Sequence, residues 1–174
     1  MKKMKFVFGL LAIAALGLTS CNNDDENNNV DNSNGIAGTY ELKEFRTPTE
    51  TDINRDNTPH ANQADETECY DNSKLKFNAD NTFSYDYRAV TVSEGIATCA
   101  SATYNGTWEV TSSNGDNVNI AATYRNSSDE TVNVTFVKTG NRLVQTSLLA
   151  RYPDVNSSNV LVYSIGTVVL VFEK

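Results

Sequence analysis

Residues 75–87 of the chain read LKFNADNTFSYDY. Large apolar or aromatic side chains occupy every second position on both sides of the polar stretch 78–81, and polar side chains fill the positions between them. A period of two is typical of a β-strand with one buried and one solvated face, and Asn and Asp are typical of turns. This segment therefore predicts two antiparallel strands joined by a tight turn. The side chains expected to face the core are Leu75, Phe77, Phe83, Tyr85 and Tyr87.

The same alternation runs from Gly38 to the end of the chain, and polar turn formers interrupt it at intervals. No segment shows the 3.6-residue period of an amphipathic helix, so the sequence predicts an all-β fold. Eight strands are expected, at residues 38–45, 73–78, 82–92, 102–112, 116–125, 130–138, 142–149 and 167–173.

Eight antiparallel strands in chain order favour an up-and-down barrel of lipocalin-like type, because closing the sheet removes both exposed edges. A β-sandwich is the alternative, since strand count and turn spacing do not separate the two. Two connections are longer than turns, at residues 46–68 and 151–158. We expect the first to be a flap over the barrel mouth, because loops of this length are usually functional or disordered.

The N-terminus has the layout of a secretory signal peptide, in which three lysines precede an apolar run over residues 6–18. That run is too short to span a bilayer. Residues 18–21 read LTSC and resemble the lipobox of bacterial lipoproteins, in which the cysteine is acylated and becomes the mature N-terminus. The sequence therefore predicts a lipoprotein signal peptide at residues 1–20 and lipidation, as by palmitate, at Cys21.

Residues 21–35 are polar and predict a disordered, lipidated tether, followed by the barrel domain at residues 36–174. Asp24, Asp25 and Glu26 resemble the export signal of surface lipoproteins of Bacteroidota. We therefore expect a lipoprotein of the outer membrane on its cell-surface side, with the periplasmic side as the alternative. The acyl chains would supply the contact with the membrane.

Charge and cysteine content narrow the partners and the compartment. The formal net charge is −8, and removing the three signal lysines makes it −11, so we expect no nucleic acid partner. Cys69 and Cys99 would remain in an oxidising compartment, where two cysteines usually form a disulfide. A reactive or metal-binding pair is the alternative, although the spacing fits no CxxC pattern.

Short motifs at the predicted strands carry a resemblance to a known group. They are GTY at 38–40, CYDN at 69–72, DNTF at 80–83 and GTW at 106–108. Together they resemble the lipocalin-like lipoproteins of Bacteroidota over roughly residues 36–174. The resemblance implies a barrel and carries over no ligand, and Tyr40 stands where true lipocalins have Trp.

No constellation for catalysis is apparent, so we expect no enzyme, no cofactor and no metal centre. His60 is the single histidine and lies in the long polar loop, and no GxSxG turn is present. Residues 52–56 place oxygen donors as a calcium loop begins, but Asn57 and Gln63 stand where the loop needs Gly and a bidentate carboxylate.

The inward positions of the predicted strands are rich in aromatic rings, which either fill the barrel or line a ligand cavity. The first function considered is binding of a small apolar or amphipathic ligand. The second is a surface or envelope interaction protein with a filled barrel, whose loops contact a protein or a glycan. The residues expected to bind such a ligand are Tyr85, Tyr87, Tyr104, Trp108 and Tyr124.

The lipobox leads to a direct prediction. Cys21→Ser should leave an unprocessed precursor, because no thiol remains to be acylated before cleavage. Labelling with radioactive palmitate, with the unchanged chain as control, measures this. Label and cleavage that persist in the Cys21→Ser chain would show that Cys21 is not the lipidated residue.

Overall fold

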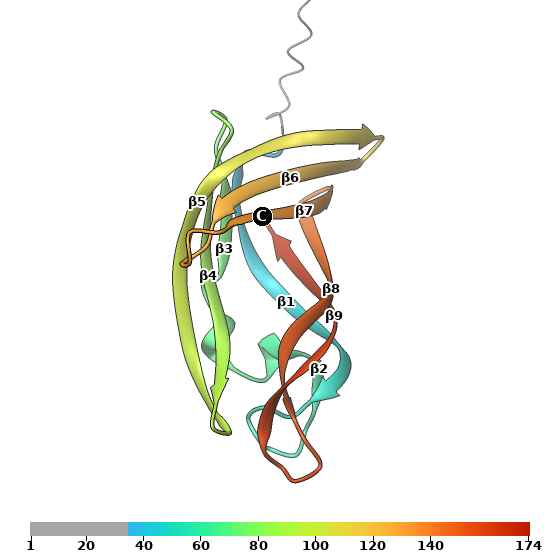
Figure 1. Cartoon of the computed structure of the whole chain (residues 1–174). Coiled ribbons are helices and arrows are strands. Elements are labelled where there is room, and N and C mark those ends of the chain that lie inside the picture. Colours follow the sequence, from blue (N-terminus) through green and yellow to red (C-terminus); the bar gives the residue numbers. More distant parts are fainter. Residues whose placement is uncertain (1–34) are drawn as a thin grey trace, which may run out of the picture. The chain divides into compact units, whose positions relative to one another are not determined.

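The computed structural model describes residues 35–174, and the predicted signal peptide, Cys21 and the tether as far as residue 34 lie outside them. The prediction of an all-β, closed, eight-stranded up-and-down barrel is confirmed (Figure 1). A ninth, short strand lies on the edge of β1. The strands are β1 (Gly38–Thr51), β2 (His60–Asn62), β3 (Lys74–Phe77), β4 (Thr82–Ser93), β5 (Ile96–Asn114), β6 (Asn117–Arg125), β7 (Thr131–Thr139), β8 (Arg142–Val155) and β9 (Leu161–Glu173).

Strand β1 closes the sheet because it pairs with β3 along one edge and with β9 along the other. Residues 38–41 pair with β3, residues 41–46 pair with β9, and residues 46–51 pair with β2. All of these pairs are antiparallel, as are the pairs from β3 to β9 in chain order. A register shift between Leu42 and Glu44 bends β1 where it passes from β3 to β9.

The end of the barrel at which the chain enters is filled with side chains. Phe77 lies at its centre, with its ring centroid 5.5 Å from that of Trp108, 5.8 Å from Phe136 and 5.9 Å from Tyr40. All three pairs are edge-to-face, a geometry that contributes about 0.5–1.5 kcal/mol per pair beyond burial of the rings. The core-facing positions expected from the sequence are therefore confirmed at this end.

The long connection after β1 is more ordered than the sequence suggested. β1 continues to Thr51, and β2 folds back on it, followed by two 3-10 helices, η1 (Gln63–Asp65) and η2 (Glu68–Tyr70). The buried amide of Gln63 explains this, because it donates to Thr51 Oγ1 (3.1 Å) and to the Pro153 carbonyl oxygen (2.6 Å). The expected flap is therefore a packed wall of the barrel.

The second long connection is a hairpin. β8 continues to Val155 and β9 begins at Leu161, so only residues 156–160 form the turn. The sequence hid this because Leu148 and Leu149 break the alternation. A bulge between Ser147 and Ala150 absorbs them, with Leu149 at φ +54°.

Two hairpins, β4–β5 and β8–β9, extend past the filled end as separate ribbons (Figure 1). β7 and β8 pair only through residues 137–139 and 142–144, and β5 pairs with β6 only from Gly106 onward. Within the described sheet, residues 96–105 of β5 and 145–155 of β8 therefore have one edge without a partner strand. We call the space between these two edges the lateral opening.

The described strands form a self-contained unit. Residues 35–174 lie within one compact body, and every strand pair and both apolar clusters are part of it. This segment therefore holds all the pairing and packing that its fold requires. Among the described residues, no helix has the length and apolar character needed to cross a bilayer.

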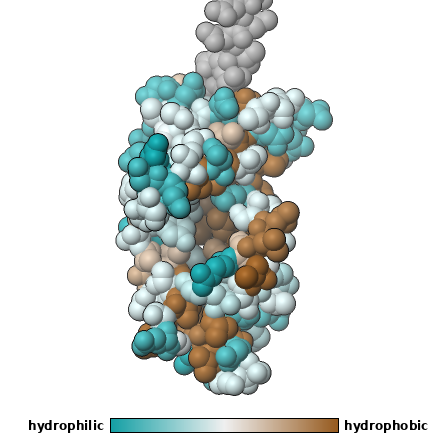
Figure 2. Space-filling view, in the orientation of Figure 1, coloured by the Kyte–Doolittle hydropathy of each residue, from teal (hydrophilic) through white to brown (hydrophobic). Residues whose placement is uncertain are grey.

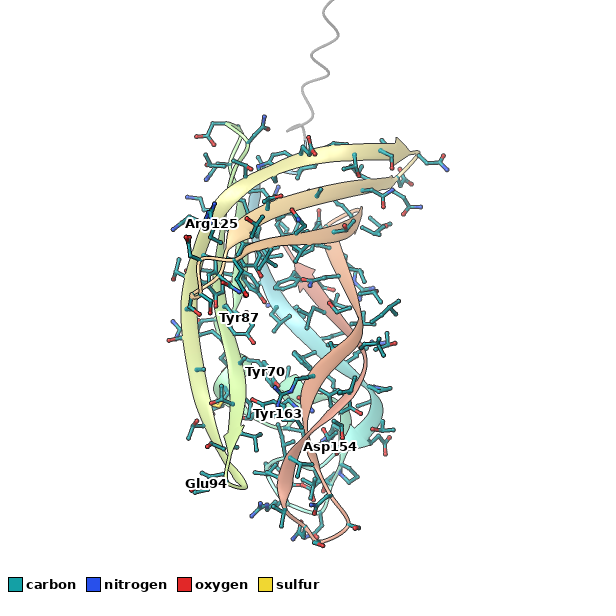
Figure 3. All side chains as sticks on the ribbon, viewed as in Figure 1. Tyr70, Tyr87, Glu94, Arg125, Asp154 and Tyr163 are labelled. Carbon is teal, nitrogen blue, oxygen red and sulfur yellow. A yellow bond between two sulfur atoms is a disulfide. The ribbon has the colours of Figure 1, made fainter. Side chains whose placement is uncertain are left out.

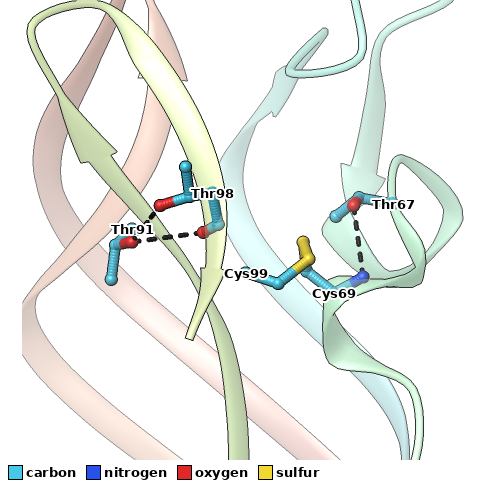
Figure 4. Close-up of a disulfide and its surroundings, with 5 residues drawn as sticks. All are labelled: Thr67, Cys69, Thr91, Thr98 and Cys99. Atoms are coloured by element: carbon cyan, nitrogen blue, oxygen red, sulfur yellow. Dashed lines mark hydrogen bonds between the residues drawn. A yellow bond between two sulfur atoms is a disulfide. The ribbon is translucent and has the colours of Figure 1, made fainter. Parts of the chain in front are cut away.

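The predicted disulfide is confirmed and joins the wall of η2 to the β4–β5 hairpin. Cys69 lies in η2 and Cys99 in β5, with their Cα atoms 5.0 Å apart (Figure 4). The Thr67 hydroxyl accepts from the backbone N–H of Cys69 (3.2 Å) and so caps η2. The bridge therefore holds one ribbon of the lateral opening to the fixed wall.

The bridge is expected to contribute measurably to stability. Replacing both Cys69 and Cys99 by Ser should lower the free energy of unfolding by about 2–4 kcal/mol, because the unfolded chain loses a cross-link that closes a loop of 30 residues. Urea unfolding of the Asp31–Lys174 segment with and without the change measures this. Two titratable thiols in the unchanged, unreduced protein would contradict the bridge.

Candidate functional site

A cavity of about 260 Å³ lies beside the lateral opening, between β4 on one side and β8 and β9 on the other. We call it the tyrosine cleft. Figure 3 shows three of its side chains, Tyr70 from η2, Tyr87 from β4 and Tyr163 from β9, gathered between the two hairpins. The residues that line it are Phe45, Tyr70, Tyr87, Ala89, Val90, Thr91, Arg151, Pro153 and Tyr163.

Two of these tyrosines are fixed by hydrogen bonds with residues that do not line the cleft. The Tyr70 hydroxyl donates to Gln63 Oε1 (2.7 Å), and the Tyr70 ring packs on Phe45 at 4.8 Å between centroids. The Tyr163 hydroxyl accepts from the backbone N–H of Val92 (3.0 Å), so its own proton remains free to donate. The cleft is therefore held open by partners outside it.

The structure brings together four of the five residues that the sequence analysis expects to bind a ligand. Tyr104 and Tyr124 stack with ring centroids 5.0 Å apart, and Tyr87 lies 5.5 Å from Tyr85 and 6.2 Å from Tyr104. Tyr87 belongs to both groups and connects this stack to the tyrosine cleft. The stack thus forms the boundary between the filled end and the cleft.

Trp108 lies elsewhere, in the filled end. It is buried against Phe77, and its ring N–H donates to the Asn78 carbonyl oxygen (3.0 Å) at the turn between β3 and β4. It does not line the tyrosine cleft. In this position Trp108 reports on the folding of the closed end of the barrel.

Burial keeps the tyrosine hydroxyls protonated. It raises the pKa of Tyr70 and of Tyr87, and the neighbouring tyrosine hydroxyls add to the effect. The pKa of Tyr124 is raised for the same reason. The hydroxyl groups of Tyr70, Tyr87 and Tyr124 are therefore neutral at any physiological pH.

One cation lies at the edge of the cleft. The guanidinium carbon of Arg151 sits 4.4 Å from the centroid of the Tyr163 ring, within the range of a cation–π contact. Arg151 is exposed, and no ion pair among residues 35–174 includes it. Its charge is thus available to a molecule that enters from solvent.

Exposed apolar side chains lie next to Arg151 on the paired strands β8 and β9. Leu148 and Leu149 precede Arg151 on β8 and are 76% and 81% exposed, and Ile165, which pairs with Arg151, is 65% exposed. We call these three residues the apolar lip. Figure 2 shows apolar surface beside and below a hollow. Exposed apolar groups gathered in one place mark a binding surface.

Other features of the described chain fit a ligand less well. A larger hollow of about 430 Å³ lies at the disulfide, but its walls are mostly polar and include Glu68, Asp71 and Arg88. The oxygens of Asp52 and Asp56 accept backbone N–H groups of their own loop, at 2.7–3.0 Å. Within residues 35–174, no group of three or more His, Cys, Asp or Glu is placed to hold a metal ion.

Sequence reasoning missed most of the cleft. The sequence places Tyr70 only in a motif that leads into a strand. Arg151 lies in the connection expected at 151–158, and Tyr163 lies between that connection and the strand expected at 167–173. The alternation of Leu161, Tyr163 and Ile165 was the available signal, because it extends the last strand backward by six residues from its expected start at 167.

The fold and the cleft define a closed up-and-down β-barrel with a side entrance. The chain belongs to the family described as "Domain of unknown function (DUF5004)", whose model matches residues 19–166. No curated protein and no solved structure matches the chain.

A half-buried pair of His60 and Glu66 joins β2 to the segment between η1 and η2, behind the cleft. His60 Nδ1 lies 2.6 Å from Glu66 Oε1, and the Glu66 side chain is fully buried. The hydrogen bond that the His60 ring donates to Glu66, with a smaller contribution from the carboxylate charge, raises the pKa of His60. The charged imidazolium is therefore stabilised by the folded state.

This shift predicts a pH dependence of stability. Because the folded pKa of His60 is raised, the stabilisation is fully present below the unfolded pKa of about 6.5 and is lost as pH rises through the folded pKa. The urea midpoint of the unchanged segment should exceed that of His60→Gln most at about pH 6 and least at about pH 9. A difference that stays constant over this range would contradict a charged pair.

Proposed function

We propose that this chain is an outer-membrane lipoprotein, anchored through Cys21, whose barrel binds a small apolar or amphipathic molecule in the tyrosine cleft. The cleft carries the proposal, because apolar walls with a few fixed polar groups are typical of small-molecule sites. The polar tether, the acidic residues after Cys21 and the resemblance to surface lipoproteins favour the outside of the cell. Neither a cofactor nor catalysis is part of the proposal.

The placement of the aromatic rings favours a barrel with a ligand cavity, in preference to a barrel that is filled along its whole length. Rings fill the entry end, whereas the cleft beyond the tyrosine stack is lined by side chains that their own wall holds in place. A second candidate is an interaction protein of the surface or envelope, with a protein or a glycan as partner. The free strand edges of the lateral opening favour it, because such edges accept a further strand.

Filling the cleft tests the proposal. The Asp31–Lys174 segment should bind an environment-sensitive apolar dye saturably, with one site per chain. Ala89 is buried in the cleft wall, and Ala89→Phe should weaken binding by about tenfold or more because the ring occupies the cavity. Dye fluorescence measures the affinity, and Trp108 fluorescence in urea checks that each variant is folded.

The matched control is Ala121→Phe, because Ala121 lies on the outward face of β6, between Glu109 of β5 and Thr135 of β7. It should leave dye binding unchanged. Equal affinity in both variants, or no saturable binding by the unchanged segment, would favour the interaction protein. Native mass spectrometry of the protein from its own host then identifies the molecule that copurifies.

A further inference from the structure

We propose that the molecule bound by the tyrosine cleft carries an anionic group, which pairs with Arg151, on a body of aliphatic or aromatic carbon. This inference rests on the proposed function and adds the chemical class of the ligand. A long-chain carboxylate is the simplest member of that class.

The lining of the tyrosine cleft contains a single charged side chain, Arg151. All other lining residues are aromatic, aliphatic or hydroxyl-bearing. The whole chain has a formal net charge of −8, so its surface as a whole disfavours anions. A single cation, with no carboxylate in the lining, therefore selects for an anionic group at this place.

Arg151 and Tyr163 both have hydrogen-bond donors that are free for a ligand. The Arg151 guanidinium lies over the Tyr163 ring, which leaves its N–H groups around the rim free to donate to oxygen acceptors. Tyr163 also has a hydroxyl proton to donate, because its oxygen already accepts from Val92. An arginine beside a phenol offers charge and donors together, as a carboxylate requires.

The tyrosine cleft is too small to enclose a long molecule. A volume of about 260 Å³ is just below the range of about 300–1,000 Å³ that is usual for ligand cavities, so only part of a longer molecule would fit inside. The remainder would cross the mouth, where Leu148, Leu149 and Ile165 are exposed next to Arg151. In this proposal the apolar lip contacts the part of the bound molecule that lies outside the cleft.

Three probes that differ only in charge test the inference. They are decanoate, decanol and decylammonium, each below its micelle concentration, titrated into the Asp31–Lys174 segment with displacement of the apolar dye as readout. Decanoate should bind roughly tenfold more tightly than decanol, as expected for one charge-assisted contact near solvent, and decylammonium more weakly than both. The advantage of decanoate should shrink as salt is added.

Two arginine variants separate the cause. Arg151→Gln should remove the preference for decanoate while leaving the affinity for decanol within about twofold. Arg88→Gln is the matched control, because Arg88 is an exposed cation that lines the polar hollow at the disulfide and not the tyrosine cleft. It should preserve the preference.

The outcomes separate the two proposals. Absence of saturable binding by all three probes would overturn the proposed function. Equal binding of the three probes, a preference for decylammonium, or a preference for decanoate that survives Arg151→Gln would overturn the anion inference alone. A preference lost equally in Arg88→Gln and Arg151→Gln would assign it to net charge and would also overturn the role of Arg151.

Discussion

The short pairing of β7 with β8 is the constraint on which the site depends. Only three residue pairs join these strands, so the barrel is closed by hydrogen bonds at one end and open along its side at the other. A longer ladder would bring β8 against β7 and remove the space between the hairpins. The filled end compensates for this, because aromatic contacts around Phe77 stabilise the part that is closed.

The two ends of the barrel are therefore stabilised by different kinds of interaction. Packed rings and the β1–β9 closure hold the entry end, whereas the far end is held by individual ties: the disulfide at Cys99, the amide of Gln63 and the His60–Glu66 pair. Each tie joins a ribbon or a wall beside the tyrosine cleft to an element behind it. Changes at these ties would therefore alter the shape of the cleft as well as the stability of the segment.

Alternation along the chain predicted eight of the strands, because the side-chain period of two is a local property that burial imposes on each strand. The removal of exposed edges then favoured a closed barrel over a sandwich. Alternation placed Leu75, Phe77 and Phe83 in the core. It could not reveal the lateral opening, because the length of a strand pair depends on register between distant segments. The bulge at Leu148 and Leu149 concealed the second hairpin, and with it Arg151 and Tyr163.

The pairing of the first strand with the last has a consequence for how the chain folds. Lys174 Nζ donates to the carbonyl oxygen of Ala37 across 137 residues, and β9 must arrive before β1 has its second partner. Local hairpins form early, but closure is a contact of maximal sequence separation and hence slow. A chain that emerges N-terminus first thus waits with two unpaired sheet edges, which are prone to aggregation until the final thirteen-residue strand is released.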